Sequence, residues 1–460
     1  MGVIADKRLN LIRGLARTLP QSSLRSLELA LGLTKEEAMV EVRELISVEL
    51  EFRHVKEAVF SPFLALFRPR GDGLAGVTFS PWLLDRLWAA LEVREPELYK
   101  QSRYALRGLR GEDPTPVVFF RLVAAGADIC RDAPDEILPP NASAADRDEV
   151  VEFANYLDLH RLMRGLLVKL SEFMGRIDAE KAAALRLMFR DAAKVNPEGG
   201  YRFMECLFAN LDDGALIVKF IATCSDRPND RFLAGSELAG FGERILDHIE
   251  EQLGDLKAFL NPRGRGTGEL DGIGERVTST LSQLQAFEAY IELSRDGPWG
   301  KRVADAHKTV AEMVEGQLKG AERLLGEALP VKSEKVYGKV RKETPRLERP
   351  PREDVVARCR QVMTFIRSVR NVANSGGFAS LHSKTVQALE QMMDEYFEEL
   401  LSIANGPDAF DPDTVMNFFE LVTDLMQALF GDDKAQVARR RVASSDLMKP
   451  RVAPAATGVA

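Results

Sequence analysis

The chain has 460 residues, of which 45% are hydrophobic and 29% charged, and a formal net charge of −8. This composition is that of a folded globular protein and excludes a largely disordered chain. The length is sufficient for two to four domains. Charge-free apolar stretches such as residues 58–67 and 114–120 are much shorter than the roughly 20 residues of a membrane-spanning helix, so we expect no transmembrane segment.

The N-terminus lacks an apolar signal core, and we expect a cytoplasmic protein. Arg outnumbers Lys about two to one, which is compatible with a GC-rich bacterial source. Four widely spaced cysteines lie mostly in apolar helical segments, and we expect buried thiols rather than disulfides or a zinc site. These cysteines are Cys130, Cys206, Cys224 and Cys359.

Residues 1–135 are predicted to form an N-terminal helical domain. The expected helices are 3–18, 22–32, one that begins after Thr34 and reaches at least Phe52, and 82–93. The segment 132–143, DAPDEILPPNAS, is rich in Pro and polar residues and marks a soft domain boundary.

Residues 144–330 are predicted to form a central bundle of long helices. Apolar residues recur at spacings of three and four from Val150 to Ile177, which predicts one bundle helix of about 30 residues. Two further helices, at 277–291 and 303–329, are joined by a short turn, and we expect an antiparallel hairpin.

Residues 331–351 differ from the rest. From 331 to 352 the chain has eight Lys or Arg, three Glu and three Pro, with weak periodicity, which predicts a semi-extended basic linker. Strand patterns are almost absent from the whole sequence. Residues 352–433 predict an acidic C-terminal bundle of three helices, and the segment 444–460 is expected to be disordered. The fold class is all-α, with long antiparallel helical hairpins and a separate C-terminal helical bundle.

Motifs for chemistry are incomplete. Glu51 and His54 form half of a di-iron motif, but no other histidine has a Glu three residues before it. The glycines within 264–268 follow a helix and not a strand, unlike a phosphate loop. His160 lies on an apolar stripe and is predicted to be a hydrogen-bonded core histidine. We therefore assign no catalytic, cofactor-binding or metal-binding residue and expect no cofactor.

Four cations at spacings of three, four and three predict a basic stripe along one helix face. They are Lys100, Arg103, Arg107 and Arg110. The stripe is suited to phosphates, an acidic helix or anionic lipid headgroups. The alternative is a solvated face that nearby acids balance. These acids are Glu92, Glu95 and Glu97.

Residues 385–433 contain twelve Asp or Glu and no Lys or Arg. Five of these acids predict an acidic face on one helix. They are Glu390, Asp394, Glu395, Glu398 and Glu399. Two interpretations remain open: the face recruits a basic partner, or other parts of the same chain neutralise it, including arginines of the preceding helix and of residues 439–441.

The leading hypothesis is a non-catalytic helical scaffold or regulatory adaptor that binds another protein, one with a basic surface, through helix faces. A second hypothesis is peripheral binding of nucleic acid or an anionic membrane surface through the basic stripe and residues 331–352. A third is a helical-bundle enzyme whose site is assembled from residues remote in sequence. The sequence does not determine the oligomeric state.

Overall fold

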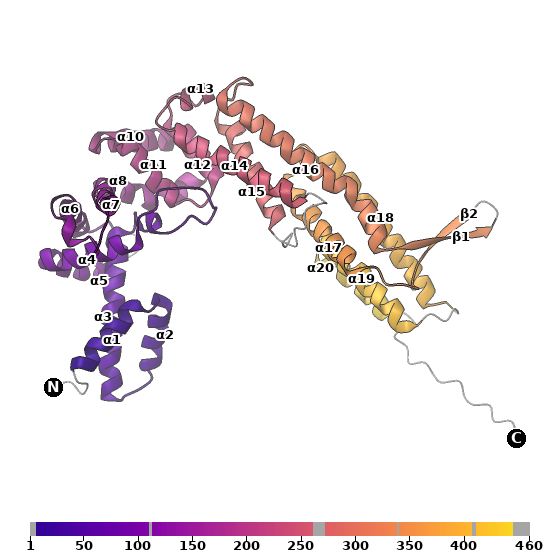
Figure 1. Ribbon diagram of the computed structural model, residues 1–460, viewed down its shortest axis with the longest axis horizontal. Coiled ribbons are helices and arrows are strands. Elements are labelled where there is room, and N and C mark those ends of the chain that lie inside the picture. The colour runs from indigo at the N-terminus through magenta and orange to yellow at the C-terminus, as the bar shows by residue number, and fades with distance from the viewer. Residues whose placement is uncertain (1–5, 110–112, 261–271, 338–339, 407–410, 445–460) are drawn as a thin grey trace. The chain divides into compact units, whose positions relative to one another are not determined.

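The computed structural model describes residues 6–109, 113–260, 272–337, 340–406 and 411–444. Within these ranges the chain is all-α, apart from one two-stranded sheet (Figure 1). No helix in these ranges is both long enough and apolar enough to cross a membrane. The chain divides into two compact units, Met1–Arg227 and Pro228–Ala460, and each is described by itself.

The first unit is a layered assembly of short and medium helices. Its elements are α1 (Asp6–Thr18), α2 (Gln21–Leu31), α3 (Glu37–Phe60), η1 (Leu64–Phe67), α4 (Pro81–Arg94), α5 (Pro96–Gly108), α6 (Val117–Asp132), η2 (Pro134–Glu136), α7 (Ala144–Leu157), α8 (His160–Val168), α9 (Leu170–Met174), α10 (Ala179–Val195), α11 (Gly199–Ala209) and α12 (Gly214–Cys224).

The main core of the first unit is aromatic. Trp88 of α4 is fully buried, and its ring meets that of Phe60 edge-on at 6.0 Å between centroids. Phe153 of α7 makes a similar edge-on contact with Phe63 at 6.1 Å. Edge-to-face rings add stabilisation beyond their buried area. The second half of α3, with α4, α6 and α7, therefore forms one continuous core.

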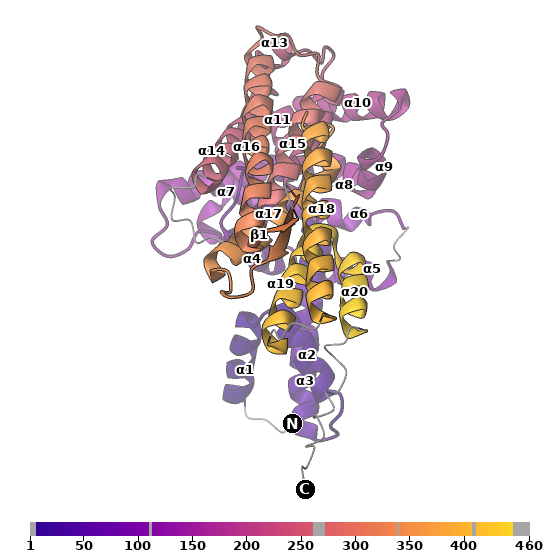
Figure 2. The ribbon, with the colours of Figure 1, turned by 90° about the vertical axis from the view of Figure 1, so that its right-hand side faces the viewer.

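The first half of α3 belongs to a smaller structure, which we call the N-terminal module and define as residues 6–50. There α1 and α2 both pack against α3 (Figures 1 and 2). The fully buried cluster of this module contains only Ala16, Leu24 and Ile46. A module with so few buried residues obtains little stabilisation from burial.

Arg53 of α3 holds the C-terminal end of α1. Its guanidinium donates to the carbonyl of Leu19 at 2.8 Å and to those of Ala16 and Arg17, both at 3.0 Å. Its Nε pairs with Glu49 at 2.9 Å. One side chain thus satisfies three carbonyls that a helix end leaves without partners.

The prediction of one helix from Val150 to Ile177 is wrong, because the chain forms α7, α8 and α9 there. The turns between them preserve the buried positions Phe153, Met163 and Phe173, so the apolar spacing continues across the breaks. The break at 132–143 lies inside the first unit, where α6 and α7 pack against each other across it.

The second unit consists mainly of long helices and begins with a short one. Its elements are α13 (Asp230–Leu233), α14 (Ala239–Leu260), α15 (Ile273–Tyr290), α16 (Pro298–Ala328), β1 (Val331–Tyr337), β2 (Val340–Pro345), α17 (Glu353–Ser368), η3 (Arg370–Val372), α18 (Ala379–Ala404), α19 (Pro412–Phe430) and α20 (Asp432–Ala443).

Helix α16 is the spine of this unit and packs against α14, α15, α17 and α18. Figure 2 shows α16 and α18 side by side. The buried residues of α16 recur at spacings of three and four and form the apolar stripe that a bundle helix needs. They run from Val303 through Ala306, Val310, Val314, Leu318, Ala321 and Leu325 to Ala328. The hairpin of α15 and α16 confirms the sequence prediction for 277–329.

Two elements of the second unit were not predicted. Residues expected to form a semi-extended basic linker instead pair as antiparallel strands β1 and β2, with Val331 opposite Pro345 and Ser333 opposite Glu343. The C-terminal bundle gains a fourth helix, α20, which packs against α19. The glycine-rich segment 261–271 and the expected disordered tail after Ser444 lie outside the described residues.

A close helix contact in the second unit gives a first prediction. A Cβ added at Gly242 of α14 would lie 2.5 Å from the Trp299 ring, whereas one at Gly254 of the same helix would meet nothing within 4 Å. We expect Gly242→Ala to lower the free energy of unfolding by about 1–3 kcal/mol through overpacking. Gly254→Ala should instead stabilise by up to about 1 kcal/mol. Urea denaturation of both variants tests this, and equal effects would contradict the contact.

Candidate interaction surfaces

The predicted basic stripe lies on α5, and the structure pairs three of its four cations. Lys100 binds Glu97 at 2.8 Å on its own helix. Arg103 and Arg107 converge on Glu51 of α3, with 2.7 Å between Arg107 and the carboxylate. Arg110 lies outside the described residues.

Glu51 is more strongly held than a surface acid. Burial by itself would raise the pKa of its carboxyl group, but the hydrogen bonds and charges of Arg107 and Arg103 outweigh this effect and hold the pKa below its ordinary value. The sequence interpretation of balance by neighbouring acids had named Glu97 but not Glu51. A partner 52 residues from Arg103 along the chain leaves no local pattern to recognise.

The predicted acidic face lies on α18, and α20 supplies cations to it. Lys434 reaches Glu390 at 2.6 Å and Asp394 at 3.0 Å. Arg441 contacts both oxygens of Glu398, one of them at 2.9 Å. These pairs favour the interpretation in which cations of the same chain neutralise the acidic face.

The two remaining acids of the face are Glu395 and Glu399, and an arginine of α17 pairs with a different helix. Glu395 accepts a hydrogen bond from Gln391 at 2.8 Å, and Glu399 is half-buried. On α17, Arg360 pairs with Asp424 of α19 at 3.2 Å. The cations of α20 therefore meet the acidic face, whereas Arg360 meets α19.

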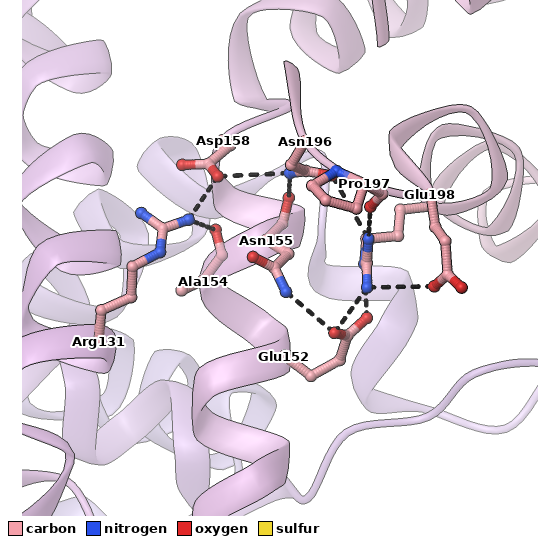
Figure 3. Close-up of polar contacts among 9 residues, drawn as sticks. Arg131, Glu152, Ala154, Asn155, Asp158, Asn196, Pro197 and Glu198 are labelled. Atoms are coloured by element: carbon pink, nitrogen blue, oxygen red, sulfur yellow. Dashed lines mark hydrogen bonds and ion pairs between the residues drawn. The ribbon is translucent and has the colours of Figure 1, made fainter. Parts of the chain in front are cut away.

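A dense polar network in the first unit brings together residues from α6, α7, α11 and the turn before α11 (Figure 3). Arg202 is buried and grips both oxygens of Glu152, at 2.6 and 2.8 Å. It also donates to the carbonyl of Pro197. Such a two-pronged arginine–carboxylate pair is strong and geometrically specific.

The other side of this network fixes the same turn. Asn196 donates to the carbonyl of Asn155 at 2.9 Å and to Asp158 at 3.3 Å, and Arg131 also binds Asp158 (Figure 3). A Cβ at Gly199 would lie 2.0 Å from the carbonyl oxygen of Ala192, so the turn allows only glycine there. The network thus attaches α10 and α11 to α7, and its charged groups bind one another.

His160 is a core histidine, as its place on the apolar stripe predicted. Its Nε2 lies 2.9 Å from the carbonyl oxygen of Val59, while Nδ1 is buried without a hydrogen-bond partner. Because a carbonyl can only accept, Nε2 carries a proton. Burial, and to a lesser degree the charge of Arg164, lower its pKa to about 4 although the hydrogen bond to Val59 opposes the shift.

The four cysteines are all buried and free, which confirms the prediction of buried thiols. In the described ranges no group of three or more His, Cys, Asp or Glu is placed to hold a metal ion.

Exposed apolar side chains distinguish the N-terminal module from the rest of the described chain. Of 21 exposed large hydrophobic residues, nine fall between positions 11 and 48, and only four belong to the second unit. The nine are Leu11, Leu15, Leu19, Leu27, Leu29, Leu33, Met39, Val40 and Val48. This concentration makes the module the candidate interaction surface of the described chain.

The sequence of α1 contains more apolar positions than one buried face requires. In α1, apolar residues occur at positions 9, 11, 12, 15 and 16, which cover more of the helix than one stripe requires. Leu11 and Leu15 form a second apolar face, which is exposed.

No family model, curated protein or solved structure matches the chain.

The pairing of α5 with α3 gives a prediction about anion binding. Replacing Glu51 by Ala removes the acid that holds Arg103 and Arg107, and we expect the full chain to elute from immobilised heparin at higher salt. Glu49→Ala is the matched control, because it removes the same charge two residues away but leaves Arg53 bound to three carbonyls. An equal shift for both variants would show that net charge alone is responsible.

The neutral ring of His160 gives a prediction about pH. Its pKa is about 4 in the folded chain and about 6.5 in an unfolded one, so between these values only the unfolded state takes up the proton. Stability should therefore fall as the pH decreases from about 6.5 to 4, by no more than about 3 kcal/mol from this residue. Urea unfolding at several pH values measures the loss.

His160→Gln is the comparison, since the amide retains a donor for the Val59 carbonyl but does not titrate. We expect the variant to lose less stability than the natural chain over the same pH range. Identical pH profiles would rule out a buried neutral histidine at this position.

Proposed function

We propose that this protein is a non-catalytic helical scaffold or regulatory adaptor that binds other proteins through helix faces. The observation that carries the proposal is the concentration of exposed apolar side chains at positions 11–48. Leu11 and Leu15 of α1 are 66% and 56% exposed and lie one helical turn apart. Leaving such side chains in water is unfavourable, and a partner that covers them gains roughly 25 cal/mol per Å².

The acidic face of α18 is the weaker candidate for the partner site. Lys434 and Arg441 already contact three of its five acids, so a basic partner would have to displace them. Exposed ion pairs of this kind contribute little stability, so a basic partner could displace them at little cost. For the same reason, the new ion pairs with that partner would add little binding free energy.

Peripheral anion binding remains the alternative function. Arg103 and Arg107 are engaged by Glu51, which reduces the charge that α5 presents. The segment 331–352, which contains the β1–β2 hairpin, is then the more cationic part of the chain, with eight Lys or Arg. Steep salt dependence of nucleic-acid binding would favour this alternative.

An enzyme is the third alternative, and the Arg202 network is where residues remote in sequence do meet. There Arg202 and Glu152 satisfy each other with two hydrogen bonds. This arrangement suits a positioning role within the fold, because each charged group already binds the other.

Site-specific photo-crosslinking tests the proposed function. A photoreactive phenylalanine replaces Leu15, or in the control Leu187 of α10, which is a leucine of almost equal exposure at 58%. We expect discrete crosslinked protein bands from position 15 in cells and none from position 187. Equal yields at the two positions, or no crosslinked species at position 15, would contradict an interaction surface on α1.

A further inference from the structure

The N-terminal module has two separate apolar faces on its outside. On α1, Leu9 and Ile12 are half-buried and Ala16 joins the cluster with Ile46, so this side faces α3. Leu11 and Leu15 occupy a different side of the helix and are exposed. We call the latter the α1 face.

The second face lies on α3. Val42, Ile46 and Leu50 turn inward to the module's cluster. Val40 and Val48, 38% and 55% exposed, are two helical turns apart on the side away from that cluster. We call this the α3 face.

The two helical segments that carry these faces have opposite net charge. Helix α1 contains four Lys or Arg and one Asp, a net charge of +3. Residues 36–48 contain four Glu and one Arg, a net charge of −3. An α1 face placed on another α1 face would bring like charges together, and so would two α3 faces. Each face is instead complementary in both polarity and charge to the other.

From this complementarity we propose that the α1 face of one molecule docks on the α3 face of a second copy of the same chain. The inference rests on the proposed function and names its partner. The α1 face and the α3 face point in different directions. When the α1 face of one molecule covers the α3 face of a second, the α1 face of that second molecule therefore remains uncovered. The contact is heterologous, and association proceeds head to tail.

Such an assembly fits the small core of the module. Docking covers Leu11 and Leu15 with Val40 and Val48 of the next molecule, and the apolar contact supplies affinity. The charges orient the encounter and make it sensitive to salt.

Two blocked variants of the full chain test the proposal by sedimentation velocity. Leu11→Asp with Leu15→Asp blocks the α1 face, and Val40→Lys with Val48→Lys blocks the α3 face. All four side chains are exposed, and circular dichroism checks that helix content is unchanged. We expect the natural chain to grow beyond a dimer as its concentration rises, and each blocked variant to be monomeric, with association weakened about a hundredfold or more.

The decisive sample is an equimolar mixture of the two blocked variants. One variant keeps its α3 face and the other its α1 face, so the mixture should form dimers and nothing larger. Leu187→Asp, at an exposed leucine outside the module, should behave as the natural chain does.

The possible contrary results are distinct. A natural chain that stops at a dimer, or blocked variants that do not combine, overturns head-to-tail docking. A natural chain that is monomeric at every concentration, but crosslinks other proteins through position 15, overturns the second copy as partner and retains the proposed function. A monomer without such crosslinks overturns both. Binding of a monomer to phosphatidylserine vesicles, lost in the α1-face variant, would assign that face to lipid.

Discussion

The burial of an apolar stripe along each helix is the constraint on which both units depend. Helix α16 meets it fully, since its stripe from Val303 to Ala328 is covered by four other helices of its unit. The second half of α3 meets it with aromatic side chains of α4 and α5, since Trp88 and Tyr99 both contact Phe52. In α1 the same constraint is met on one side, while a second set of leucines has no helix over it. The uncovered set is informative because exposed large apolar side chains of the described residues are concentrated at positions 11–48.

Ion pairs between helices support this packing. The concentrated acids of α18 face the cations of α20, and the arginines of α5 face Glu51 of α3. In each case a one-sign pattern in the sequence meets its complement from another helix. The short N-terminal module is different, because its basic and acidic apolar faces lie on separate helices and turn different ways.

The helical character of the chain could be predicted from the sequence, because spacings of three and four are repeated many times and require no knowledge of tertiary contacts. The α15–α16 hairpin followed from such local patterns and from the short turn between the two helices. The separation of α7 from α8 could not be predicted, because the apolar spacing continues across Leu159. The contacts of Asp158 at this break come from Arg131 and Asn196, which are distant in the sequence and leave no local pattern.

The hairpin and the candidate site escaped prediction for other reasons. Strands β1 and β2 are rich in charged residues and lack the apolar alternation that marks a half-buried strand. Pairs such as Arg103 with Glu51 join positions that are far apart in the chain. Exposure of Leu11 and Leu15 depends on which side of α1 meets α3, and periodicity alone does not determine this when two sides are apolar.

The binding of Arg53 restricts what can replace it. Its planar guanidinium group binds three carbonyl groups at the end of α1 and the carboxylate of Glu49. These contacts hold the short turn between Thr18, the last residue of α1, and Gln21, the first residue of α2. A lysine would keep the charge, but a single ammonium group on a flexible stem cannot reproduce that planar fork. Substitution by lysine would therefore loosen the angle between α1 and α3 without opening the core, and it would change the direction in which Leu11 and Leu15 point. Divergent copies of this chain that retain arginine here would preserve the orientation of α1 even where the leucines themselves are exchanged.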